Sequence, residues 1–356
     1  MNNTESLDEL IARIVPVDDA AAEAARVRQG RLTKPAGSLG QLESIGTQLA
    51  AIAGACPPPV PTSATICVFA GDHGVTRAGV TPWPSEVTAQ MVANFCAGGA
   101  AINVLARHVG ARVTVVDVGV ATPIPGDAVG LVRRNVALGT KNLAVEAAMT
   151  PEQARAALAV GADVAREAVE AGAQLLATGD MGIGNTTPSA ALIAALTGSN
   201  PSEVTGRGTG IDDETWRLKV GVISGALARL APDATPIEVL GEVGGLEIAA
   251  LAGFILGGAA AHVPVVIDGV IAVAAATVAA AMAPEVTGYL IGGHRSSEPG
   301  ATVALAHLGV TPLLDLNLRL GEGSGAALAL PLVQAAAKIL GEMATFESAG
   351  VSERDA

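Results

Sequence analysis

The chain has 356 residues, of which 50% are hydrophobic, 2% aromatic and 15% charged. That length is enough for one large α/β domain or two domains with a substantial core. The formal net charge of −13 argues against nucleic acid as a partner, because an acidic surface repels phosphate polymers.

Residues 1–55 read as helices without strands, and their acidic, amphipathic start shows no signal-peptide pattern, so we expect a cytoplasmic protein. The run Cys56-Pro57-Pro58-Pro59 marks the entry into a sheet domain over residues 56–330, since consecutive prolines cannot continue a helix. Residues 331–356 again read as helical. We expect them to pack with residues 1–55 as a small helical subdomain.

Several short apolar runs, each followed by glycine or an acid, predict strands that are buried on both faces of a parallel sheet. The runs are residues 65–74, 113–119, 174–182, 263–269, 288–296 and 311–317. Helical patterns lie between several of them. The clearest starts at Thr150, the expected N-cap, with Pro151 in the first helical position and Gln153 completing a capping box.

Alternating strands and helices predict a doubly wound, Rossmann-like α/β fold, in which ligands bind at the carboxyl ends of the strands. Polar residues are expected at or just beyond those ends: Asp72, Asp117, Asp180, Asp268, His294 and Asp315. Any one of these acids is explained as well by the capping of a following helix.

The uncharged run Gly269–Pro284 is shorter than the ~20 strongly apolar residues of a membrane span, and we interpret it as a buried strand and helix. No membrane association is expected. The three cysteines form no CxxC pair, so neither a disulfide framework nor a zinc site is indicated.

The segment Gly179–Leu192, GDMGIGNTTPSAAL, follows a predicted strand and enters a predicted helix. Gly182 and Gly184 permit close approach of a ligand to the backbone, Thr187 is the expected cap, and Pro188 the first helical residue. A glycine turn at a helix N-terminus suits an anion or a nucleotide. The segment lacks the Walker lysine and does not match GxGxxG, and a purely structural turn is the alternative.

The segment Leu318–Leu330 places Glu322 between Gly321 and Gly323, after a strand and before an Ala/Leu helix. Flanking glycines let the backbone place this carboxylate with little steric shielding. The alternative is a glutamate that only stabilises the start of the following helix through the helix dipole.

Two further segments carry candidate chemistry. In Ala70–Val92, Asp72 and His73 invite a metal site, but HxH and HExxH spacings are missing, so we expect no metal; Trp83 could wall a flat aromatic ligand or pack on the surface. In Gly206–Lys219, three glycines with Arg207 and Lys219 could bind a phosphate, or form a solvated loop.

Together these segments resemble the nicotinate-nucleotide–dimethylbenzimidazole phosphoribosyltransferase family. The resemblance runs in order from about residue 30 to the C-terminus. It rests on KPAGSLGQLE (34–43), GDHGV (71–75), EVTAQMV (86–92), GDMGIGNTTPSAAL (179–192), GRGTGIDDE (206–214), GEVGGLEIAALAG (241–253), HRSSEPG (294–300), LDLNLRLGEGSGAALAL (314–330) and EMATFESAGVSE (342–353).

The resemblance implies a Rossmann-like sheet domain, a small domain of helices from both chain ends, a homodimer, and no metal or other cofactor. It implies nicotinate mononucleotide and 5,6-dimethylbenzimidazole as substrates, with α-ribazole 5′-phosphate and nicotinate as products and inversion at the anomeric carbon. It assigns Glu322 as the base, Gln90 to the base pocket and Lys219 to the phosphate. The other expected site residues are Asp180, Trp83, Gly182, Gly184, Asn185, Thr186, Gly208, Ser296 and Leu320.

Three positions depart from the family pattern. Asp180 stands where some members have a glutamate, Trp83 where a tyrosine is expected, and Val270 where a phenylalanine is expected. The carboxyl group of Asp180 is expected about one methylene closer to the backbone than that of a glutamate. Which aromatic base is preferred as the acceptor stays open. Two other classes stay open as well: a metal-dependent phosphoesterase built on Asp72 and His73, and a non-catalytic nucleotide-binding regulator.

Overall fold

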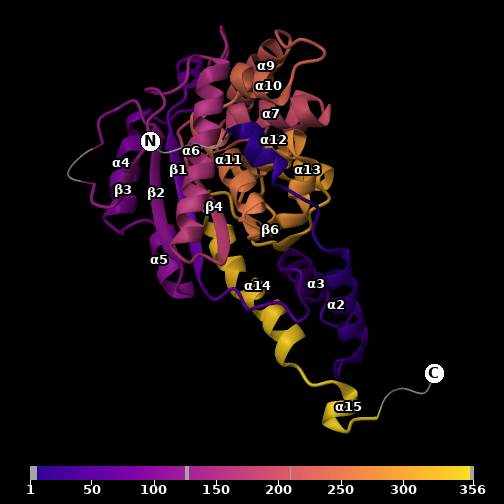
Figure 1. The fold of residues 1–356 in the computed structure, drawn as a ribbon. Helices are drawn as coiled ribbons and strands as arrows, with labels where there is room; N and C mark the ends of the chain where they lie inside the picture. The colour runs from indigo at the N-terminus through magenta and orange to yellow at the C-terminus, as the bar shows by residue number, and fades with distance from the viewer. Residues whose placement is uncertain (1–5, 125–127, 209, 353–356) are drawn as a thin grey trace.

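The computed structural model describes residues 6–124, 128–208 and 210–352. Its described part is built around one parallel sheet with the order β3-β2-β1-β4-β5-β6-β7, and Figure 1 shows helices on both sides of it. The strands are β1 (Ala64–Gly71), β2 (Arg112–Gly119), β3 (Leu131–Arg133), β4 (Leu175–Met181), β5 (Val265–Ile267), β6 (Leu290–His294) and β7 (Pro312–Leu314).

The helices come mainly from the segments between the strands and from both chain ends. They are α1 (Leu7–Ala12), α2 (Asp19–Arg31), α3 (Gln41–Ala53), η1 (Gly74–Ala78), α4 (Glu86–Cys96), α5 (Ala101–Val109), α6 (Pro151–Glu170), α7 (Thr186–Thr197), α8 (Pro201–Val204), α9 (Asp213–Leu227), α10 (Pro236–Val243), α11 (Leu246–Ala260), α12 (Val270–Met282), η2 (Pro284–Tyr289), α13 (Pro299–Leu308), α14 (Ser324–Glu342) and α15 (Phe346–Ala349).

All the apolar runs that predicted strands form strands, which confirms the parallel α/β sheet. The short strand β3 was not predicted, because its three residues at the sheet edge are only partly buried and carry no continuous apolar run. The strand order reverses between β1 and β4. Their carboxyl ends therefore form the topological switch point, where open α/β sheets bind ligands.

Side chains alternate between the two faces of the sheet, as the period of a strand requires. On β1, Ile66, Val68 and Ala70 join a core with α3, α4, α5 and α14, whereas Cys67 and Phe69 join the core with α6, α7, α11 and α12. The Phe69 ring packs edge-on against Phe254 of α11 at a centroid distance of 5.4 Å. Both faces of the sheet are thus covered, which explains the uninterrupted apolar runs.

Helices α6 and α11 pack closely through glycines. A Cβ on Gly161 would overlap the carbonyl of Ala250, and a Cβ on Gly253 would overlap the carbonyl of Leu158. The small side chains of this aromatic-poor sequence therefore allow backbone-to-backbone contact between helices.

Two expected helix starts have different outcomes. Thr150 caps α6, with Pro151 in the first turn and a complete capping box with Gln153, as predicted. The expectation for Thr187 and Pro188 is wrong, because α7 begins at Thr186 with Asn185 at the N-cap. The Asn185 side chain makes no cap bond and binds Asp180 instead.

The chain ends meet along α14. In Figure 1, α2 and α3 lie beside the lower part of this helix, and Leu32 pairs with Thr345 in an isolated antiparallel bridge. The predicted boundary between residues 330 and 331 lies inside α14, and α1 packs against α6 and α11. The division into a large and a small domain stays a prediction, and residues 1–5 and 353–356 lie outside the described part.

Two segments are long and apolar enough to be tested as membrane spans, Glu86–Val109 and Ser324–Glu342. The first segment contains α4 and α5, and the second is α14. All three helices pack against the same face of the sheet. The run Gly269–Pro284 forms the buried helix α12 rather than a strand and a helix.

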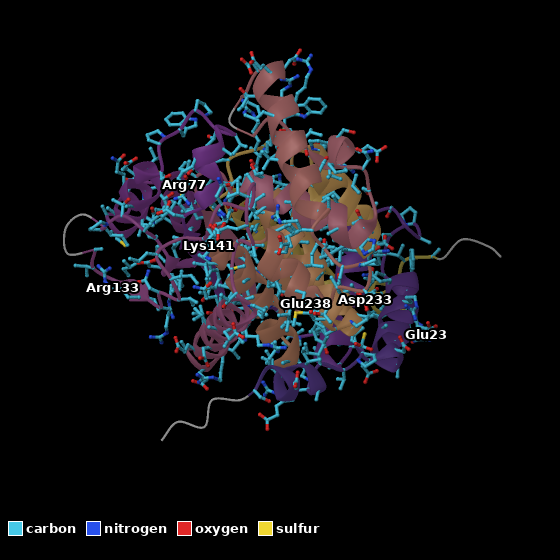
Figure 2. The ribbon with its side chains drawn as sticks, turned by 90° about the horizontal axis from the view of Figure 1, so that it is seen from above. Glu23, Arg77, Arg133, Lys141, Asp233 and Glu238 are labelled. Atoms are coloured by element: carbon cyan, nitrogen blue, oxygen red, sulfur yellow. The ribbon has the colours of Figure 1, made fainter. Side chains whose placement is uncertain are left out.

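Figure 2 shows Arg77, Arg133 and Lys141 on the side of the molecule opposite to Glu23.

We predict that Gly161→Ala destabilises the protein by about 1–3 kcal/mol, because the added methyl group forces α6 and α11 apart. The matched control is Gly221→Ala in α9, where a Cβ meets no atom within 4 Å and a better helix former should be neutral or stabilising. Urea unfolding of both variants measures the difference. Equal stability of the two variants would contradict the close packing.

Candidate active site

A cavity of about 130 Å³ opens at the carboxyl edge of the sheet. Its walls come from the segments that follow β4, β5 and β6, from the loop before α9 and from the residues before α14. The predicted site residues that line it are Asp180, Gly182, Gly184, Asn185, Thr186, Gly208, Lys219, Ser296 and Leu320. The fold therefore brings together side chains that the sequence places far apart.

Lys219 forms one end of the cavity. It projects from α9, is 1% exposed, and its Nζ donates a hydrogen bond to Thr186 Oγ1 at 2.8 Å. Burial lowers the pKa of Lys219 to about 8, although the nearby Glu298 acts in the opposite direction. This ammonium group is costly to bury and has one hydroxyl as its hydrogen-bond partner among the described residues, so it is suited to receive an anion.

The loop before α9 is held by two side chains that were not predicted as site residues. The Gly208 N–H donates to Glu298 Oε1 at 2.8 Å, and the Arg319 guanidinium donates to the Gly208 carbonyl at 3.0 Å. Glu298, at the start of α13, is itself buried. The Gly208 N–H is therefore engaged with Glu298. Arg207, Arg319 and Lys219 bring positive charge to the cavity, although Arg207 pairs with Asp213 and the walls also include the acids Asp180 and Glu298.

The loop between β4 and α7 lies against the end of β1. Gly182 has no room for a side chain, since a Cβ would lie 2.5 Å from the Gly71 carbonyl, and Gly184 has φ +90°. The Ile183 N–H donates to Thr88 Oγ1 at 3.1 Å, which ties the loop to α4. These constraints explain why glycines occur at both positions.

Asp180 lies at the end of β4 and is 5% exposed. Its Oδ2 accepts a hydrogen bond from Asn185 Nδ2 at 2.9 Å, whereas its Oδ1 has no hydrogen-bond partner among the described residues. Burial raises the pKa of Asp180 well above its usual range, and the negative charges of Asp268 and Glu247 add to this. Asp180 is therefore set up to carry a proton.

Glu322 occupies an unusual backbone conformation. Gly321, Glu322 and Gly323 have φ values of +82°, +63° and +91°, and the left-handed region is costly for a residue with a Cβ. Asp268, just after β5, binds the backbone of this turn. Its oxygens accept backbone N–H groups from Gly325 at 2.7 Å, Ala326 at 2.9 Å and Gly323 at 3.3 Å.

The Glu322 carboxylate is 6% exposed and accepts a hydrogen bond from the Ile102 N–H, in the first turn of α5, at 3.2 Å. Burial raises the pKa of Glu322, the Ile102 bond lowers it, and the charge of Asp268 raises it again. Gly179 of β4 is needed beneath this turn, because a Cβ there would lie 2.6 Å from the Glu322 carbonyl. A carboxylate with a raised pKa is a stronger proton acceptor than an exposed one.

Asp72 and His73 have separate partners. Asp72 Oδ2 accepts the Ala121 N–H at 2.8 Å, while His73 Nε2 lies 2.6 Å from Glu247 Oε1, with both of the paired side chains buried. Within the described residues, no three His, Cys, Asp or Glu side chains are grouped as metal ligands. The phosphoesterase alternative therefore gains no geometric support from these residues.

Glu322 does not line the cavity itself, although the preceding Gly321 does, and Gln90 and Trp83 do not line it either. Gln90 is on the exposed side of α4, and Trp83 is 49% exposed. Their role in binding an aromatic base stays a prediction. Sequence reasoning missed Glu298, Arg319 and Glu247 as site residues, although Glu298 lies in the HRSSEPG segment, and it noted Asp268 and His294 only as residues at strand ends.

The comparisons with known proteins agree with this geometry. A family model described as phosphoribosyltransferase matches residues 14–351. The chain belongs to this phosphoribosyltransferase family. The nicotinate-nucleotide–dimethylbenzimidazole phosphoribosyltransferase of Salinispora tropica is 57% identical over 98% of this chain and 100% of its own length. The enzyme of the same name from Geobacter sulfurreducens is 54% identical over 98% of this chain and 99% of its own length.

Solved structures extend the likeness to the fold. The crystal structure of the nicotinate-nucleotide–dimethylbenzimidazole phosphoribosyltransferase of Thermus thermophilus superposes with a TM-score of 0.90 at 50% sequence identity. The superposition covers 95% of this chain and 100% of the Thermus chain. The Rossmann-like sheet and the order of its segments are thus those of this phosphoribosyltransferase family.

We predict that Lys219→Met raises the Tm of the ligand-free protein at pH 7. The native pKa of about 8 lies below the unfolded value near 10.5, so the native state binds protons less well than the unfolded chain. Native stability should therefore rise with pH between these values in the wild type, and the advantage of the variant should shrink. Thermal unfolding at pH 7 and pH 10 measures this, and a constant difference would contradict the cost of burying the ammonium.

Proposed function

We propose that this chain transfers the phosphoribosyl group of nicotinate mononucleotide to 5,6-dimethylbenzimidazole, in assembly of the lower ligand of cobalamin. The products are α-ribazole 5′-phosphate and nicotinate. The observation that carries the proposal is the identity of 57% with the Salinispora enzyme, which extends over nearly the whole of both chains. The enzyme acts as a cytoplasmic homodimer without a metal or other cofactor, and a related base could replace dimethylbenzimidazole.

The nucleotide phosphate binds at the Lys219 end of the cavity. The buried ammonium, the Thr186 hydroxyl and the start of α7 meet there, and Arg207 and Arg319 line the same space. The positive end of a helix and a buried cation both favour a phosphate. In a protein of net charge −13, this local concentration of cations supports a specific anion site.

The chemistry of the substrates decides where help is needed. Nicotinate attached to the ribosyl carbon is a pyridinium, so it leaves as the C–N bond breaks and its ring nitrogen takes the electron pair. The incoming benzimidazole forms a new C–N bond through one nitrogen while its other nitrogen carries a proton. A base that takes this proton keeps the product from becoming a cation.

Glu322 takes that proton. Its carboxylate is buried and follows Gly321, a residue of the cavity wall, and the left-handed turn presents it without a neighbouring side chain on either side. A positioned general base contributes ~10²–10⁴-fold to a rate. The negative charge also stabilises the ribosyl centre while that carbon is positively charged in the transition state.

Mixing the purified protein with nicotinate mononucleotide and 5,6-dimethylbenzimidazole tests the proposed function. The expected result is release of nicotinate together with α-ribazole 5′-phosphate, in equal amounts. The regulator alternative predicts that the nucleotide binds but stays intact, and the phosphoesterase alternative predicts release of inorganic phosphate that a chelator abolishes. Either of those outcomes would overturn the proposal.

We predict that Glu322→Gln lowers kcat by ~10²-fold or more while both substrates bind within a few fold of wild type. The amide keeps the volume of the side chain but cannot accept the proton, so kcat and kcat/KM should fall together. Steady-state kinetics and calorimetry measure the two effects. Near-normal kcat would remove Glu322 from the role of base, and a collapse in Tm would assign it to the start of α14.

We predict that Asp180→Asn retains measurable turnover with a raised KM for the nucleotide. Asn matches a protonated aspartate in shape, and burial raises the pKa of Asp180 so that its neutral form is favoured. Asp180 supports the loop through Asn185 and lines the cavity with its free oxygen. Abolished turnover with unchanged binding of the nucleotide would transfer the base role to Asp180.

A further inference from the structure

His294 is a buried titratable residue that the mechanism above does not use. It ends β6, is 2% exposed, and lines the same cavity as Lys219 and Asp180. Neither ring nitrogen has a hydrogen-bond partner among the described residues. A buried polar group without a partner is costly, so a ring in this position calls for an explanation.

The ring is fixed in place by its surroundings. A Cβ on Gly325, in the first turn of α14, would overlap the imidazole, and a Cβ on Gly269 would lie 3.5 Å from Nε2. His294 Nε2 is 3.5 Å from Asp268 Oδ1, which is within reach of an ion pair but too long for a good hydrogen bond. The glycines and Asp268 thus orient a ring that keeps its hydrogen-bonding capacity.

The position of His294 along the cavity indicates what it would meet. Lys219 and Thr186 mark the phosphate end, and Gly321 and Asp180 mark the end next to Glu322. In nicotinate mononucleotide the ribose joins the phosphate to the reacting carbon. His294 lines the same cavity as both of these ends and lies against Gly325 in the first turn of α14. We therefore expect its side chain to face the sugar.

We propose that His294 is a ribose-binding residue, whose imidazole exchanges a hydrogen bond with a ribose hydroxyl of the nucleotide while Asp268 holds the ring. This inference rests on the proposed function and assigns the contact to the sugar rather than to the phosphate. The ligand hydroxyl supplies the partner that the buried ring lacks.

The test measures the affinity of nicotinate mononucleotide and of its 2′-deoxy and 3′-deoxy analogues by calorimetry, without an acceptor base. Wild type should lose about 10-fold in affinity for the analogue that lacks the contacted hydroxyl, the scale of one buried hydrogen bond. His294→Leu should bind nicotinate mononucleotide about 10-fold more weakly than wild type, with no further loss for that analogue. His294→Gln, which restores an N–H donor, should recover part of the affinity.

His262→Gln is the matched control, because this exposed histidine lies between α11 and β5, at the amino edge of the sheet. It should bind all three ligands as wild type does. The inference is overturned if wild type binds both deoxy analogues as tightly as nicotinate mononucleotide, a result that needs no variant to fold. It is also overturned if His294→Leu and wild type lose equal affinity on removal of each hydroxyl.

These outcomes separate the inference from the proposed function. If the wild type binds nicotinate mononucleotide and releases nicotinate but shows no coupling between His294 and a ribose hydroxyl, only the inference fails. If His294→Leu weakens binding of nicotinate riboside, which lacks the phosphate, by the same factor as binding of the nucleotide, the contact is not to the phosphate and the inference stands. If the variant and wild type bind the riboside equally, the contact is to the phosphate and the inference is overturned. If wild type binds no nucleotide, the proposed function fails first.

Discussion

The arrangement of the site depends on one buried carboxylate, Asp268, which binds the start of α14. Its two oxygens accept three backbone N–H groups, so it satisfies donors that the first turn of a helix leaves without partners. The same bonds hold the turn that contains Glu322. Left-handed backbone at a residue with a Cβ costs ~1–2 kcal/mol, and hydrogen bonds to a charged acceptor are large enough to offset it.

The buried acids around this carboxylate differ in whether an imidazole lies beside them. Glu247 and Asp268 each have an imidazole partner, His73 at 2.6 Å and His294 at 3.5 Å. Asp180 and Glu322 have no imidazole partner among the described residues, and burial raises the pKa of both, as it does for Asp268. The two acids assigned roles in the reaction are therefore the ones without an imidazole partner.

Much of the fold could be predicted because the relevant signals are local. Continuous apolar runs predicted the buried strands, and Thr150 with Gln153 predicted the start of α6, since both features depend on neighbours in sequence. The edge strand β3 and the start of α7 were missed. At Asn185 a tertiary bond to Asp180 replaces the local capping pattern.

The site could be predicted only in part, because only some of its features depend on residues that are close in sequence. Glycine-rich turns indicated Glu322 and the β4–α7 loop, because backbone with φ > 0 favours glycine, which can be recognised in the sequence. The support of that turn by Asp268, the approach of Glu298 to Gly208 and the place of His294 in the cavity depend on distant segments. No local pattern distinguishes these side chains from ordinary acids and histidines after strands.

The central claim is that the buried Glu322 carboxylate accepts the proton during turnover. The most direct test is kcat as a function of pH, with both substrates saturating, for wild type and Glu322→Gln. Glu322 acts only when ionised, and burial raises its pKa, so wild-type kcat should fall as the pH drops through a value above that of an exposed glutamate. The slower variant should show no such fall, and an identical acidic limb in both proteins would contradict the claim.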